Sequence, residues 1–248
     1  MNPEIHSLAA GQWIVLAAGA FFIGLSKTGL PGAGILAVPI IAAVIPAKAS
    51  TGMVLPMLIV GDLFAVYWYR RHAVWQHLLR LLPYAIAGIL IGWKIMLRIT
   101  DEQLRPMIGA IILAMLVIHL LRSRSEGASA PKSHLVPAGL GLSTGITTML
   151  ANAAGPIMTI YLKTMRLPKT AFIGTGAWYF LIVNLLKVPL SAGMGLINPA
   201  SLRVNLLLSP MVIAGALIGI LVVNYISEKL FGRAVLLLAA LGAIKLIL

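Results

Sequence analysis

Hydrophobic residues lie along this chain in about ten long runs, separated by short polar or Gly- and Pro-rich stretches. The runs are continuous rather than alternating, so they favour α-helices over β-strands. They cover roughly residues 8–25, 32–46, 50–69, 77–97 and 105–121, and then 135–151, 154–165, 171–190, 203–225 and 232–248. The pattern predicts an all-α protein with five hydrophobic segments on each side of a polar stretch.

The lengths of these segments differ. A helix needs about 20 apolar residues to cross a bilayer, and the last three segments of each half mostly meet that length. The first two of each half are short and are separated by Gly, Pro or Asn. They are typical of broken or re-entrant helices, which are stable at membrane depth only when buried in protein or lining a cavity. We therefore expect eight to ten membrane segments.

The second half of the chain repeats the first. Pro83–Gly92 (PYAIAGILIG) returns as Pro210–Gly219 (PMVIAGALIG), and the stretch after Pro46 returns after Pro168. The matches keep their order at spacings of 122 to 127 residues, as an internal duplication does.

The number of crossings sets the relative orientation of the halves. Each half crosses an odd number of times, whether its short pair re-enters or spans, so the second half runs in the opposite sense. The sequence predicts two inverted-topology repeats, residues 1–122 and 135–248, joined by a cytoplasmic linker at 123–134.

Composition makes lipid the expected solvent. Hydrophobic residues make up 60% of the 248 residues and charged residues only 10%, whereas soluble proteins carry about 25% charged residues. A net charge of +13 fits the enrichment of Lys and Arg in cytoplasmic loops. The basic residues form no clustered surface with base-reading groups, so nucleic acid is not an expected partner. The chain has no cysteine, which excludes disulfides and thiolate metal sites.

Loop charge predicts the orientation in the membrane. One side of the predicted topology collects Arg70, Arg71, Arg122, Arg124, Lys132, Lys163, Arg166, Lys169, Lys229 and Arg233. That side is cytoplasmic by the positive-inside rule. We expect a multi-pass protein of the cell inner membrane with both termini outside.

A Gly-rich stretch, Gly24–Gly34, is the first candidate binding segment. It contains Ser26, Lys27, Thr28 and Gly32 inside an apolar region. Broken helices present free backbone N–H groups and a positive dipole end, which suit an anion. Lys27 is either a partner for that anion or a residue that extends to the headgroups.

Its counterpart in the second half is Ser143–Pro156. Thr147, Thr148 and Asn152 are polar within an apolar segment, and Gly155-Pro156 interrupts the helix. These side chains either bind the same ligand or form the Ser/Thr contacts that pack membrane helices together.

Three further polar residues lie deep in predicted spans. Asn184 and Lys187 share a helix face, because they are three residues apart. An ionisable residue inside a span is functional by default, so Lys187 is expected to bind an anion or to pair with an acid. Asp62 maps onto Asn184 under the repeat register, and it either carries a coupling proton, neutralises Lys187 or makes a structural contact.

Other motifs carry less chemistry. Thr51 and Thr175 stand near the starts of matching segments, where a hydroxyl caps a helix or contacts a ligand. Gly88-xxx-Gly92 and Gly215-xxx-Gly219 are expected to pack helices closely. Gly141-Leu-Ser-Thr-Gly145 matches the serine nucleophile motif, but its context is a membrane helix rather than a strand. We expect neither an enzyme nor a cofactor or metal site.

The order of these motifs resembles the TauE/SafE family of sulfite and organosulfonate exporters. The resemblance rests on Gly29–Gly34 with Val38-Pro39, Pro46 to Gly52, Arg70-Arg71, Asn152–Pro156, Gly174–Trp178 and Asn184-x-x-Lys187-x-Pro189. The second half departs by carrying Ala151–Gly155 in place of a Gly-Gly-Gly cluster.

The resemblance implies movement of small anionic sulfur compounds such as sulfite, sulfonates or sulfoacetate. We expect a secondary transporter that exports such an anion by alternating access, coupled to protons or to the membrane potential. An anion channel, or a transporter of another small organic anion, is the alternative. The expected partners are the anion and the lipid bilayer, and a homodimer is left open.

Overall fold

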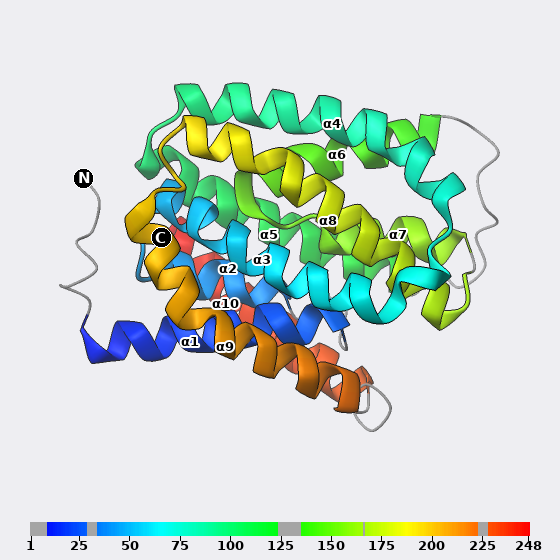
Figure 1. Cartoon of the computed structure of the whole chain (residues 1–248). Helices are drawn as coiled ribbons and strands as arrows, with labels where there is room; N and C mark the ends of the chain where they lie inside the picture. The colour runs from blue at the N-terminus through cyan, green and yellow to red at the C-terminus, as the bar shows by residue number, and fades with distance from the viewer. Residues whose placement is uncertain (1–8, 29–33, 124–134, 166, 223–227) are drawn as a thin grey trace.

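A computed structural model describes residues 9–28, 34–123, 135–165, 167–222 and 228–248. These residues form α-helices and one short 3-10 helix, and none of them lies in a strand (Figure 1). The all-α class predicted from the sequence is therefore confirmed. The elements are α1 (Ala10–Thr28), α2 (Gly34–Ala42), α3 (Ala47–Tyr69), η2 (Arg70–His72), α4 (Trp75–Arg98), α5 (Asp101–Ser123), α6 (Leu135–Ala151), α7 (Gly155–Thr164), α8 (Lys169–Gly193), α9 (Pro199–Val222) and α10 (Glu228–Ile247).

Five stretches of the described chain are long and apolar enough to cross a membrane. They are Ala10–Thr28, Ala47–His72, Trp75–Arg98, Lys169–Gly193 and Pro199–Leu221. Helices α2 and α7 are short, with 9 and 10 residues, as the sequence predicts. Helix α1 is longer than predicted, with 19 residues. It continues through Lys27 and Thr28 because both side chains have polar partners inside the protein.

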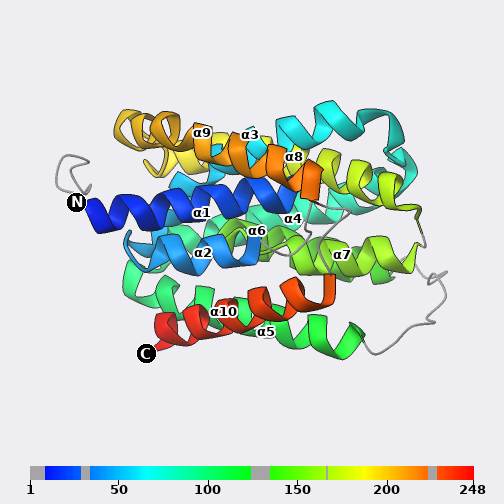
Figure 2. The same ribbon diagram turned by 90° about the horizontal axis from the view of Figure 1, so that it is seen from below.

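Repeated prolines set the starts of two equivalent helices. Helix α3 begins directly after Pro46 and α8 directly after Pro168. Both prolines have an extended backbone, with φ near −51° and −55°, and the chain turns helical at the next residue. Figures 1 and 2 show that α3 and α8 run side by side in opposite directions. Of the five membrane-span candidates, these two have the largest buried fractions.

Each half also contains a helical hairpin. Helix α1 packs against α2, and α6 packs against α7. The chain reverses between Thr28 and Gly34 in the first hairpin and at Asn152–Ala154 in the second. Figure 2 shows that α1 ends and α7 begins within the bundle rather than at one of its ends. Residues 29–33 of the first reversal, which include the candidate Gly32, lie outside the described residues, as does the predicted linker at 124–134.

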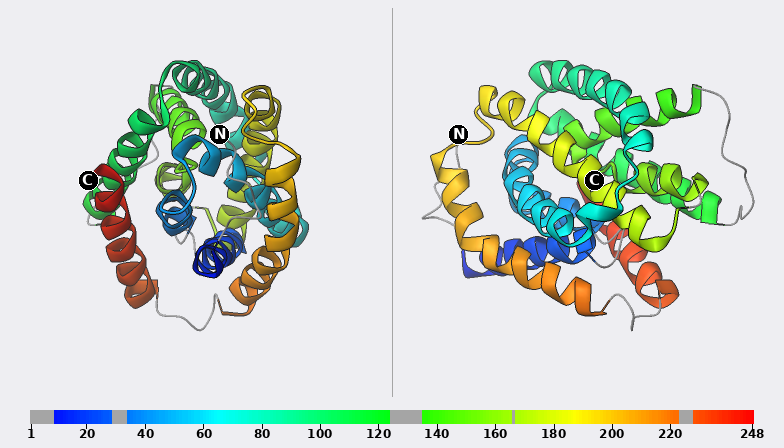
Figure 3. Two further views of the ribbon diagram at one scale, coloured as in Figure 1. Left: turned by 90° about the vertical axis from the view of Figure 1, so that its left-hand side faces the viewer. Right: turned by 45° about the vertical axis from the view of Figure 1, so that its right-hand side comes forward.

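Glycines allow two close helix crossings. Helix α1 packs along α9, and α6 packs along α4 (Figure 3). In the first crossing Gly24 lies against the carbonyl of Val212, and Gly215 lies against the carbonyl of Phe21. In the second, Gly145 lies against Ala85, and Gly88 against Leu142. A side chain at any of these positions would meet backbone, so the expected packing role of Gly88 and Gly215 agrees with the structure.

Much of the described outer surface is apolar. Large hydrophobic side chains are exposed on α4, α9 and α10, including Leu79, Leu206, Leu221 and Leu237. Lipid is the solvent that such a surface requires. The start of α1 and the end of α10 lie at one end of the bundle, and η2 and the start of α8 lie at the other (Figure 2).

Candidate functional site

A cavity lies between the end of α1, the start of α2, the turn from α6 into α7, and the central helices α3 and α8. Its empty volume is about 880 Å³, including space open to solvent. The polar side chains that line it are Ser26, Lys27, Asp62, Thr148, Asn152, Thr159 and Asn184. They come from both halves of the chain, so the cavity is completed only when the halves pack together.

Lys27 and Asp62 form an ion pair at the cavity wall. Lys27 Nζ lies 2.7 Å from Asp62 Oδ1. The side chain of Asp62 is fully buried, and that of Lys27 is 11% exposed. Lys27 also lies over the ring of Phe180, 4.4 Å from its centroid, where the aromatic face attracts the cation. Lys27 therefore points into the protein and does not extend to the headgroups.

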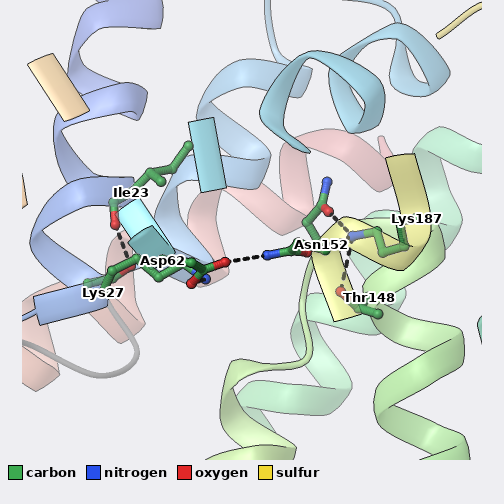
Figure 4. Close-up of polar contacts among 8 residues, drawn as sticks. Ile23, Lys27, Asp62, Thr148, Asn152 and Lys187 are labelled. Carbon is green, nitrogen blue, oxygen red and sulfur yellow. Dashed lines mark hydrogen bonds and ion pairs between the residues drawn. The ribbon is translucent and has the colours of Figure 1, made fainter. Parts of the chain in front are cut away.

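Asn184 connects this pair to the second lysine. Its Nδ2 donates to Asp62 Oδ2 at 2.7 Å, and its Oδ1 accepts from Lys187 Nζ at 3.3 Å. Lys187 also donates to Asn152 Oδ1 at 2.6 Å and to Thr148 Oγ1 at 3.2 Å (Figure 4). Three donations account for the three hydrogens of an ammonium group. Lys187 is thus held by neutral oxygens, and Asp62 pairs with Lys27 rather than directly with Lys187.

The cluster contains more basic than acidic groups. Its titratable members are Lys27, Lys187 and Asp62, so with all three ionised it carries one net positive charge in a buried place. A buried charge is costly unless it is paired. Only Lys27 of the two lysines lines the cavity, and Lys187 lies behind Thr148, Asn152 and Asn184. An anion in the cavity would balance the charge by direct contact with Lys27.

The backbone of Asn152 positions its side chain. Asn152 follows the end of α6 and has φ of 51°, in the left-handed region. Asn tolerates this region better than most residues. The turn leaves the amide free to bridge the halves, because Nδ2 donates to the carbonyl of Thr51 at 3.1 Å while Oδ1 accepts from Lys187.

Two substitutions of Asn152 separate its backbone role from its side-chain role. Both Asn152→Gly and Asn152→Ala remove the contact to Lys187. Alanine pays a further penalty of about 1–2 kcal/mol for the left-handed backbone, which glycine does not. We expect Asn152→Ala to unfold more readily than Asn152→Gly in equilibrium unfolding of the purified protein. Equal stability of the two variants would contradict a requirement for this backbone conformation.

Several predicted site residues bind backbone groups instead of lining the cavity. Thr28 Oγ1 donates to the carbonyl of Ala216 at 2.6 Å, and Thr147 Oγ1 donates to the carbonyl of Ser143 at 2.8 Å. Thr175 Oγ1 accepts from the backbone N–H of Val74 at 2.9 Å, so it ties α8 to the start of α4. Ser26 lines the cavity, although its hydroxyl donates to the carbonyl of Ile23.

The cavity also has an apolar wall that sequence reasoning missed. It is formed by Met158, Leu162, Phe172, Ile173 and Phe180, among others. These residues are ordinary members of apolar runs.

The fold and the cavity define a multi-pass membrane protein with a charged interior site. The chain belongs to the family described as Sulfite exporter TauE/SafE, whose pattern it matches over residues 16–246. This is a family of membrane transporters rather than enzymes. No curated protein and no solved structure matches the chain.

Proposed function

We propose that the protein is a secondary transporter that exports a small anionic sulfur compound, such as sulfite, a sulfonate or sulfoacetate. The observation that carries the proposal is the buried cluster of Lys27, Asp62, Asn184 and Lys187 at the wall of a cavity, in which two lysines face one carboxyl group. Family membership supports the transporter class and the sulfur anion. The membrane potential itself favours the exit of an anion.

Alternating access is the proposed mode of action, based on inverted repeats. The opposite directions of α3 and α8 support the inversion. Two pairs of contacts support it further, because α1 packs on α9 as its counterpart α6 packs on α4. In this arrangement residues 1–122 and 135–248 are the two repeats, and the anion lies between them. The end of the bundle that holds η2 is the proposed cytoplasmic end in the inner membrane, because it carries Arg70 and Arg71.

Ligand-induced stabilisation of the purified protein tests this function. The panel is sulfite, sulfate, thiosulfate, sulfoacetate, taurine and acetate. One sulfur anion at about 100 times its Kd should stabilise the protein by about 2.7 kcal/mol, read as a thermal shift. Lys187→Ala should strongly weaken that shift, because it removes the buried charge and frees Thr148 and Asn152 to reorient.

The matched control is Lys94→Ala, which removes an exposed lysine of α4. An unchanged shift in Lys187→Ala would contradict the role of that residue, and no shift with any sulfur anion would contradict the substrate class. In proteoliposomes, a transporter accelerates labelled-anion efflux when counter-substrate is present on the other side. Flux that counter-substrate does not accelerate would identify an anion channel instead.

A further inference from the structure

The charges around Asp62 come from two helices. Lys27 of α1 lies 2.7 Å away, and Lys187 of α8 is reached through Asn184. Helix α2 and helix α6, as described, contain no titratable residue. In the other helices packed on α3, Asp101 of α5 accepts from the backbone N–H of Lys48, and Arg203 lies in the first turns of α9. Among the described residues, the charge balance beside Asp62 therefore depends on two lysines and one carboxylate.

This charge balance favours the binding of a monoanion over that of a dianion. With Asp62 and both lysines ionised, the cluster has one net positive charge, which a monoanion neutralises. A dianion would leave one negative charge in a buried site, and an uncompensated buried charge is strongly unfavourable. Protonation of Asp62 removes this excess negative charge.

The two oxygens of Asp62 have different partners. Oδ2 accepts from Asn184 Nδ2, whereas Oδ1 has the ion pair with Lys27 and no hydrogen bond. An anion that binds Lys27 from the cavity competes with Oδ1 for the same ammonium. Oδ1 is then left without a partner in the protein interior, and it is the atom at which a proton is most favoured.

We infer that the site binds a monoanion with Asp62 ionised but binds a dianion together with one proton, taken from solution onto Asp62 Oδ1. This inference rests on the proposed function and specifies the charge of its substrates. Both classes then occupy the site with the same total charge. The membrane potential would act equally on the loaded site in both cases.

Calorimetry of the native protein counts the protons. Methanesulfonate is the monoanion, and sulfoacetate is the dianion with the same sulfonate group. Each is titrated at one pH in two buffers of different ionisation enthalpy, which yields the protons taken up on binding. We expect about one proton for sulfoacetate and about none for methanesulfonate. The affinity for sulfoacetate should fall about tenfold per pH unit while free Asp62 is ionised, and that for methanesulfonate should stay constant.

The variant Asp62→Asn tests whether Asp62 is the residue that takes up the proton. It retains the size of the side chain and should bind sulfoacetate without proton uptake and without the pH slope. Lys94→Ala is the control, and it should retain both the proton uptake and the pH dependence of sulfoacetate binding. Equal proton counts for the two anions, or an uptake that survives in Asp62→Asn, would overturn the inference and leave the proposed function standing. Absence of binding by both anions would overturn the inference, and absence of binding by every sulfur anion of the panel would overturn the proposed function as well.

Discussion

Replacing Lys27 with methionine should eliminate anion-induced stabilisation and lower the free energy of unfolding by about 3–5 kcal/mol. Lys27 is the lysine that lines the cavity, so its loss removes the direct contact to the anion. It also leaves the Asp62 carboxylate buried without its counterion. Breaking a buried ion pair from one side costs about 3–5 kcal/mol, because an unpaired charge remains. Equilibrium unfolding and the thermal shift with the best anion measure the two effects.

The double variant Lys27→Met with Asp62→Asn separates the loss of folding stability from the loss of anion binding. Removing both charges of a buried pair is often close to neutral, and asparagine still has an oxygen for the Asn184 amide. The double variant should therefore recover most of the stability lost by the single variant, but not the response to the anion. A single variant that still responds to the anion would show that Lys27 is not its partner. A double variant as unstable as the single one would show that the ion pair is not the source of the loss.

The helices were largely predictable because their signals are local. Hydrophobic runs and the Pro and Gly residues between them gave segments that overlap the described helices. The apolar pattern places the starts of α3 and α8 late, at 50 and 171, because the polar residues Lys48, Lys169 and Thr170 interrupt the apolar runs in the first turns. The apolar run ends near residue 25, whereas helix α1 continues to Thr28 because Lys27 and Thr28 have polar partners inside the protein.

The site was predictable only where the repeat gave long-range information. The repeat register aligned Asp62 with Asn184, and these two side chains are hydrogen-bonded. The ion pair of Lys27 with Asp62 depends on how α1 packs against α3, which no local pattern encodes. Hydroxyl groups were the least predictable, since a threonine binds a backbone group or a ligand with the same atoms. Thr28 and Thr175 bind backbone groups, whereas Thr148 lines the cavity.

Gly24→Ala and Gly145→Ala should each destabilise the protein by about 3 kcal/mol, the upper end of the usual cost of overpacking. A Cβ at Gly24 would overlap the carbonyl of Val212 in α9, and one at Gly145 would overlap the carbonyl of Ala85 in α4. Backbone cannot move aside as a flexible side chain can, so the two helices must separate. Each crossing packs a helix of one hairpin against the other half of the chain. The variants should therefore also lose anion-induced stabilisation. Equilibrium unfolding of purified variants measures the first effect.

Helices α1 and α6 each contain a second glycine that serves as a control position. Gly11 in α1 and Gly139 in α6 have open space where a Cβ would be placed. Alanine is a better helix former than glycine by about 1 kcal/mol, so Gly11→Ala and Gly139→Ala should be neutral or stabilising. Since Gly24 and Gly145 occupy matching places in the proposed inverted repeats, similar losses at the two sites would support that symmetry. A large loss at one crossing and none at the other would mean that the two halves do not pack as equivalent units, and would argue against a mechanism in which they exchange roles.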